Sequence, residues 1–160
     1  MKIFLFAVLA ALIGVPACNS TSQEKLPDFD LLLPDSTTVL HTRDIPSGQP
    51  VVIIHFESNC GECQKETESI LKNMDSLKQV RFYFVTLETF DRLDVFNVHY
   101  KLASFPNIVA GQDFKHAMEQ HYKPLTTPML AIYNGQKQLR VVIGGSTSTS
   151  ELIHTIHEIQ

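Results

Sequence analysis

The chain has 160 residues, of which 44 % are hydrophobic and 19 % are charged, so it carries enough apolar material for one packed domain. Thirteen Lys and Arg stand against 17 Asp and Glu, a formal net charge of −4 with no basic block, which excludes the electrostatic signature of a nucleic-acid-binding protein. No apolar run reaches the ~18 residues of a transmembrane helix, and three cysteines are too few for a disulfide scaffold.

Residues 1–17 have the composition of a secretory signal. Lys2 is the only charged residue before Glu24, and it precedes the uncharged, mostly apolar run Ile3–Val15. That run is too short to span a bilayer stably, but it suits the hydrophobic region of a signal peptide. We therefore expect a cleaved signal over residues 1–17, the alternative being a buried N-terminal helix.

The end of this run, Val15-Pro16-Ala17-Cys18, resembles a bacterial lipoprotein signal, in which the cysteine after a small residue becomes lipidated. Pro16 is not the usual residue at its position, and an ordinary cleavage site that leaves Cys18 as a free thiol is the alternative. Acyl chains bury many methylenes at about 0.8 kcal/mol each, so an acylated Cys18 would hold the protein on a membrane. The resemblance implies a lipidated tether over residues 18–26 and a place in the bacterial cell envelope, facing the periplasm or the surface.

The domain expected over residues 27–160 begins with a hairpin. Asp28–Leu33 and Thr37–His41 are short runs separated by a Pro-Asp-Ser turn. After a Pro- and Gly-containing loop comes Val51–Phe56, an apolar β-branched run that only His55 interrupts. This pattern predicts a central strand buried on both faces, with His55 as a hydrogen-bonded core or edge residue.

Helices and strands alternate from there to the C-terminus. The patterns predict, in order, a helix over about 60–77, a strand Val80–Leu87, a helix Glu88–Tyr100, a short strand within 103–110, a short helix Asp113–His121, strands Pro128–Tyr133 and Gln138–Ile143, and a last helix after the capping box Ser148-x-x-Glu151. Asn134-Gly135 predicts a hairpin turn between the last two strands. This order indicates an α/β fold with a parallel part and an antiparallel edge.

Cys60-Gly61-Glu62-Cys63 follows the buried strand directly and begins the next helix. The first sulfur then lies at a helix N-terminus, where unsatisfied N–H groups and the helix dipole favour a thiolate. The second sulfur lies one turn later and is sheltered, so it can resolve a mixed disulfide by intramolecular attack. Cys60 is the predicted attacking thiolate and Cys63 the resolving thiol.

Two other uses of the cysteine pair stay open. Half of a zinc or Cu(I) site would need further ligands; the sequence has no second CxxC, and only His116 and His121 have a ligand-like spacing. A structural disulfide between Cys60 and Cys63, as in a non-enzymatic binding lipoprotein, would close a very small loop and give little chain-entropy benefit. We expect no bound metal.

Residues 27–160 resemble the thioredoxin-like superfamily, and in particular the exported TlpA/ResA-type thiol-disulfide oxidoreductases and redoxins. The resemblance rests on Leu26–Leu31, similar to the opening strand, on Val51–Phe56 with the CxxC, and on Thr127-Pro128, similar to the cis-proline segment. It implies a central mixed sheet flanked by helices, with an N-terminal hairpin and a strand–helix insertion between the CxxC and the proline.

The resemblance also implies a function. Cys60 and Cys63 would exchange disulfides without a further cofactor, Thr127 and Pro128 would offer backbone to the partner chain, and Glu66 would tune the thiols and move protons. The plainer alternative for Glu66 is a solvated helix glutamate. The implied partners are exported proteins with disulfides and a membrane thiol reductase.

The sequence departs from the family pattern beside the cysteines. Asn59 stands where an aromatic residue is usual, and we expect it to cap the helix together with Glu62. Ile54 replaces the buried acid of thioredoxins. Peroxiredoxins carry a threonine where this chain has Glu57, whose charge would repel a thiolate, so peroxidase activity is not expected. Acidic residues around the thiols oppose the thiolate and favour a reductant-like couple.

We predict that the wild-type protein, expressed in a bacterial host, partitions with membranes, because acylation of Cys18 would anchor it. Cys18→Ala should release the protein or stall its processing. Membrane fractionation with N-terminal mass analysis checks this, and a wild-type protein recovered free in solution and starting at Asn19 would contradict it.

Overall fold

The computed structural model describes residues 24–159, so the predicted signal peptide and Cys18 lie outside the described residues. Within the described part, no helix combines the length and the apolar character that crossing a membrane requires.

One mixed sheet forms the centre of the molecule, with the strand order β2-β1-β5-β4-β3-β6-β7. The strands are β1 (Asp30–Leu32), β2 (Val39–His41), β3 (Val51–His55), β4 (Arg81–Thr86), β5 (Ile108–Gln112), β6 (Met129–Tyr133) and β7 (Leu139–Gly144). Strands β3, β4 and β5 are parallel, whereas β6, β7 and the β1–β2 hairpin add antiparallel pairs on the two sides. The predicted α/β arrangement, its N-terminal hairpin and its inserted strand β5 are confirmed.

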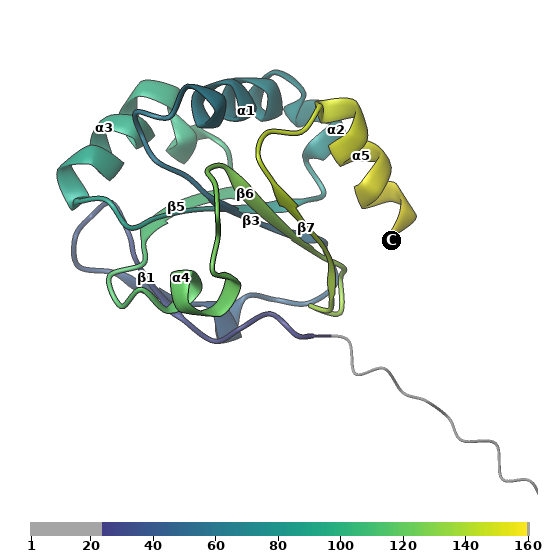
Figure 1. Cartoon of the computed structure of the whole chain (residues 1–160), viewed down its shortest axis with the longest axis horizontal. Helices are drawn as coiled ribbons and strands as arrows, with labels where there is room; N and C mark the ends of the chain where they lie inside the picture. Colours follow the sequence, from purple (N-terminus) through teal and green to yellow (C-terminus); the bar gives the residue numbers. More distant parts are fainter. Residues whose placement is uncertain (1–23, 160) are drawn as a thin grey trace, which may run out of the picture.

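The helices cover both faces of this sheet. They are α1 (Gly61–Lys72), α2 (Met74–Leu77), α3 (Phe90–Tyr100), α4 (Ala117–Tyr122) and α5 (Thr149–Glu158), with short 3₁₀ turns η1 (Thr42–Asp44) and η2 (Leu102–Ser104). In Figure 1, α1, α3 and α5 lie on one side of the sheet, and α4 lies on the other side with β1.

Each face of the sheet has its own hydrophobic core, because side chains alternate along a strand. Val52 and Ile54 of β3 pack with the helices α1, α3 and α5, whereas Val51 and Ile53 pack toward the hairpin and α4. All five residues of β3 are buried, which explains why the strand has an apolar run and not an alternating pattern. His55 is on the same face as Val51 and Ile53.

The hairpin turn predicted between β6 and β7 is confirmed: Asn134 accepts from the Gln136 and Gln138 N–H groups, and Lys137 takes the left-handed conformation. Two other local predictions differ from the structure. The helix expected over 60–77 breaks at Asn73, whose amide donates to the Ser69 carbonyl (2.8 Å) and whose backbone leaves the helical region before α2 begins. Glu24–Leu26, assigned to the tether, already hydrogen-bond to the start of β7.

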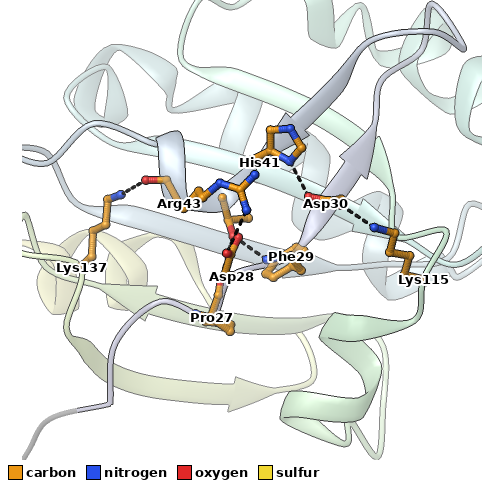
Figure 2. A network of polar contacts seen from close by, with 9 residues as sticks. Pro27, Asp28, Phe29, Asp30, His41, Arg43, Lys115 and Lys137 are labelled. Carbon is orange, nitrogen blue, oxygen red and sulfur yellow. Dashed lines mark hydrogen bonds and ion pairs between the residues drawn. The ribbon is translucent and has the colours of Figure 1, made fainter.

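Polar contacts tie the N-terminal hairpin to the rest of the fold (Figure 2). The Asp30 carboxylate accepts from Lys115 (2.7 Å) and from His41 (2.5 Å), and these two hydrogen bonds lower the pKa of Asp30 to about 2. Arg43 donates to Asp28 (3.1 Å), and its carbonyl accepts from Lys137 (3.1 Å) in the β6–β7 loop. These contacts fix the hairpin to Lys115, just before α4, and to the β6–β7 loop.

Candidate active site at the cysteine pair

Cys60 lies at the point where the chain leaves the buried strand β3 and begins α1. Its backbone is extended (φ −79°, ψ 114°), and its sulfur accepts the Cys63 N–H at 3.2 Å, so Cys60 is itself the cap of the helix. The prediction that Asn59 caps α1 is wrong. The Cys60 sulfur accepts the Cys63 N–H, so this donor is not left for the Asn59 side chain one residue earlier.

Glu62 does not complete a capping box either. Its carboxylate accepts from Lys65 (2.8 Å) and from the Ser146 hydroxyl (3.0 Å). The Lys65 ammonium group therefore compensates the negative charge of Glu62, which lies between the two cysteines in the sequence.

The two thiols differ in exposure. Both are free cysteines; Cys60 is partly exposed, whereas Cys63 is 1 % exposed and belongs to the core on the α1 side. A partner molecule can therefore reach the sulfur of Cys60 but not that of Cys63.

The two thiols also differ in acidity. Burial raises the pKa of Cys60, but hydrogen bonds from Cys63, from Thr127 and from the Glu62 backbone outweigh it, so this pKa lies below that of an ordinary thiol. Burial, followed by the hydrogen bond with Cys60, raises the pKa of Cys63 to about 12. Cys60 therefore loses its proton before Cys63 does.

The Thr127–Pro128 peptide bond is cis, as the resemblance implies, and it lies beside the outer thiol. The Cys60 thiol donates to the Thr127 carbonyl at a sulfur–oxygen distance of 3.6 Å. Pro128 is buried, and its own carbonyl accepts from Gly145 (2.8 Å) after β7. The structure thus brings Cys60, Cys63, Thr127 and Pro128 together, although the first and last of these are far apart in sequence.

Glu66 is a buried carboxylate on α1, one turn beyond Cys63. It is 3 % exposed, and its carboxylate accepts the Thr147 N–H at 2.9 Å. Burial raises the pKa of Glu66, partly offset by that hydrogen bond. The alternative of a solvated glutamate is therefore excluded for Glu66, while its neighbour Glu68 is exposed. Residues three apart share a helix face, which places Glu66 on the side of Cys63.

Glu88, which the sequence did not single out, holds the loop in front of Cys60. Its carboxylate accepts from the Ser58 N–H (2.5 Å), from the Ser58 hydroxyl (3.1 Å) and from Arg92 (3.0 Å). Gln64 of α1 donates to the Ser58 carbonyl (2.9 Å). The available signal was an acid two residues after strand β4, at the carboxyl end of the parallel strands, where functional side chains collect.

The remaining histidines and Met129 do not join the cysteine pair. Within residues 24–159, no group of three His, Cys, Asp or Glu side chains could hold a metal ion. His116 pairs with Glu119 and His121 with Glu24, and Met129 is buried in the core on the α4 side. His55 is buried as predicted, but its Nδ1 lacks the hydrogen bond that we expected.

Many solved structures share the fold of this chain. The MTB dsbF structure in mixed oxidised and reduced forms superposes with a TM-score of 0.70 at 20 % identity, covering 82 % of this chain and 95 % of that one. StoA from Bacillus subtilis superposes with a TM-score of 0.63 at 17 % identity, covering 81 % of this chain and 96 % of StoA. A secreted Mycobacterium tuberculosis disulfide oxidoreductase homologous to E. coli DsbE superposes with a TM-score of 0.67 at 16 % identity. The superposition covers 81 % of this chain and 95 % of that one.

No protein-family model and no curated protein matches the sequence. At these identities the structural similarity establishes the fold. The described chain has a thioredoxin-like fold, as its sequence resemblance implied.

We predict that a thiol alkylating reagent labels the reduced protein at Cys60 first. Its rate should rise with the thiolate fraction and reach half its maximum below pH 9.0, whereas labelling of Cys63 should need a pH near 12. Mass spectrometry of digests across a pH series measures both rates, with Cys63→Ser as the control that isolates Cys60. Equal rates at pH 7, or faster labelling of Cys63, would contradict the assignment.

Proposed function

We propose that this protein is an exported, membrane-tethered thiol-disulfide oxidoreductase that exchanges disulfides with exported protein partners. The observation that carries the proposal is the asymmetry of the pair: Cys60 is reachable and more acidic than an ordinary thiol, and Cys63 is buried and less acidic. The cis-proline segment beside Cys60 supports it, because its Thr127 carbonyl already contacts the reacting sulfur.

The exchange has two steps. In the first, the Cys60 thiolate attacks one sulfur of the partner's disulfide; a Cys60–partner bond forms, and the other partner sulfur leaves as a thiolate. In the second, Cys63 loses its proton and attacks the Cys60 sulfur, which forms the Cys60–Cys63 disulfide and releases the second partner sulfur. The partner gains two electrons and, with two protons, becomes a dithiol, while this protein is oxidised.

The second step needs a proton acceptor, because the pKa of Cys63 is about 12. Glu66 supports this role: it is a buried carboxylate one turn along α1, with a pKa raised by burial. A carboxylate whose pKa is raised accepts a proton more readily than an exposed one. We assign Glu66 to taking up the Cys63 proton as the pair becomes a disulfide.

Electron flow toward the partner is the direction we propose. A strong oxidant requires a strongly stabilised thiolate, and positive side chains are a usual source of such stabilisation. At Cys60 the groups that lower the pKa are neutral donors, Cys63, Thr127 and the Glu62 backbone, and burial opposes them. The cycle then requires a thiol reductant, in our proposal a membrane thiol reductase, to reduce the Cys60–Cys63 disulfide again.

Export and tethering are supported by residues outside the described part. The charged and apolar segments over residues 1–17 and the lipoprotein-like Cys18 support them. The Mycobacterium tuberculosis structure with the same fold is described as that of a secreted protein. An oxidising compartment is where exported disulfides need exchange.

We predict that Cys63→Ser accumulates mixed disulfides with partner proteins, because the resolving attack on the Cys60 sulfur is lost. Cys60→Ser, the matched control that removes the same kind of atom, should form few. Non-reducing electrophoresis of cells quenched with acid and an alkylating reagent measures both. Equal trapping by the two variants would reverse or remove the assigned roles. Stoichiometric metal that resists dialysis and is lost in Cys60→Ser would favour a metal-handling protein instead.

We also predict a reducing Cys60/Cys63 couple, with a potential of about −250 mV and not near −120 mV. The reason is the absence of a cation among the groups that lower the Cys60 pKa in the described chain. Equilibration with glutathione buffers of known potential, followed by alkylation and mass analysis, gives the value. A couple near −120 mV would refute the reductant direction and leave the exchange chemistry intact.

A further inference from the structure

A cavity of about 400 Å³ lies next to the cis-proline segment. It is lined by His55, Glu57, Leu87, Glu119, Pro124, Leu125, Thr126 and Thr127. Thr127 connects it to the reactive sulfur, because its carbonyl oxygen lies 3.6 Å from the Sγ of Cys60. The cavity therefore lies beside the sulfur to which a partner chain would be bonded.

The polar groups that line the cavity offer mainly hydrogen-bond acceptors. Two carboxylates and two threonines line it, and no lysine or arginine is among its lining residues. Within residues 24–159, Glu57 has no ion-pair partner, and Glu119 has only the exposed His116, at 3.0 Å. Lys123 is close in sequence but forms no ion pair with either carboxylate in the described chain. The negative charge of the cavity is thus largely uncompensated.

His55 gives the cavity an unpartnered polar group that is independent of the two carboxylates. The residue is 6 % exposed, and its Nδ1 has no hydrogen-bond partner in the described chain. Burial lowers the pKa of His55, although Val85, Glu57 and Glu119 act in the opposite direction, so the site favours the neutral ring. A neutral imidazole carries one free nitrogen lone pair, which can accept a hydrogen bond from a cation. Buried polar groups without partners are rare enough to require a reason.

We propose that this cavity receives a lysine or arginine side chain of the partner, located within a few residues of the partner's exchanging cysteine. Carboxylates of Glu57 and Glu119 would pair with the cation, and the neutral His55 ring would accept a hydrogen bond from it. Leu125, which is fully exposed beside the cavity, would cover the aliphatic part of that side chain. This inference rests on the proposed function, and it names the substrate class as disulfides flanked by basic residues.

The test uses peptides that contain the same disulfide and differ only in one residue next to the cysteine: Lys, Gln or Glu. Reduced wild-type protein should reduce the Lys peptide roughly 1.5- to 5-fold faster than the Gln peptide at low salt, the range expected for one exposed ion pair. The Glu peptide should be slowest, and added salt should shrink the differences. The double variant Glu57→Gln, Glu119→Gln should bring the Lys-to-Gln ratio close to one.

Glu68→Gln is the matched control, because Glu68 is an exposed carboxylate on α1, on the other face of the sheet. It removes one carboxylate charge near the cysteines without touching the cavity, and it should preserve the wild-type ratio. A ratio of one for the wild-type protein, with all peptides reduced, would overturn the cation subsite and leave the proposed function standing.

A binding measurement separates the two proposals. Peptides with serine in place of cysteine cannot exchange, so their binding is followed through the ring resonances of His55, identified by their absence in His55→Phe. The Lys peptide should shift these resonances more, and at lower concentration, than the Gln peptide does. If no disulfide peptide is reduced but this difference persists, the exchange function is wrong and the subsite stands. Equal binding of both peptides would overturn the subsite.

Discussion

The hydrogen bond from the Cys63 N–H to the sulfur of Cys60 is the interaction on which the rest of this site depends. It makes one sulfur the cap of α1 and places the other a turn deeper, in the core. A helix N-terminus supplies unsatisfied donors, and here a thiol supplies the missing acceptor. The same bond therefore completes the secondary structure and lowers the proton affinity of the outer thiol.

That cap requires a fixed backbone just before Cys60, and residues outside the CxxC motif fix it. The strand β3 is buried along its whole length, and the Glu88 carboxylate from the β4–α3 loop fixes the Ser58 backbone and hydroxyl just before the cysteine. Across the sheet, the loop that ends in Pro128 closes the other side of the sulfur. The reactive atom lies beyond the carboxyl end of β3, at the start of α1 and against the core on the α1 side of the sheet.

Much of this could be predicted from the sequence, because the informative signals are local. The uninterrupted β-branched run predicted β3, and a CxxC directly after it predicted both the start of α1 and the unequal roles of the cysteines. The cap was misassigned to Asn59 because sequence preferences for caps favour oxygen-bearing side chains and give little weight to sulfur. Asn73 interrupts the expected helix by bonding to the carbonyl four residues before it, a competition that apolar periodicity does not register.

Other features depend on contacts between distant segments. Glu88 acts on Ser58 through the pairing of β3 with β4, and only the register of those strands brings them together. The burial of Glu66 depends on the Thr147 amide before α5. His55 has a hydrogen-bonding atom without a partner, which no sequence pattern signals. In each case the residue type was visible, but its surroundings were set by tertiary structure.

The attachment of Glu24–Leu26 has a consequence for how the molecule would stand on a membrane. These residues bond to the β6–β7 loop and the start of β7. That loop adjoins the Val51 end of β3, since Val51 pairs with Tyr133 and His55 pairs with Met129. The chain thus enters the domain at the end of the sheet opposite to the thiols. A lipid on Cys18 would leave Cys60 directed away from the bilayer, so soluble partners would meet it freely, and a reductase embedded in the bilayer would have to extend a domain outward to reach it.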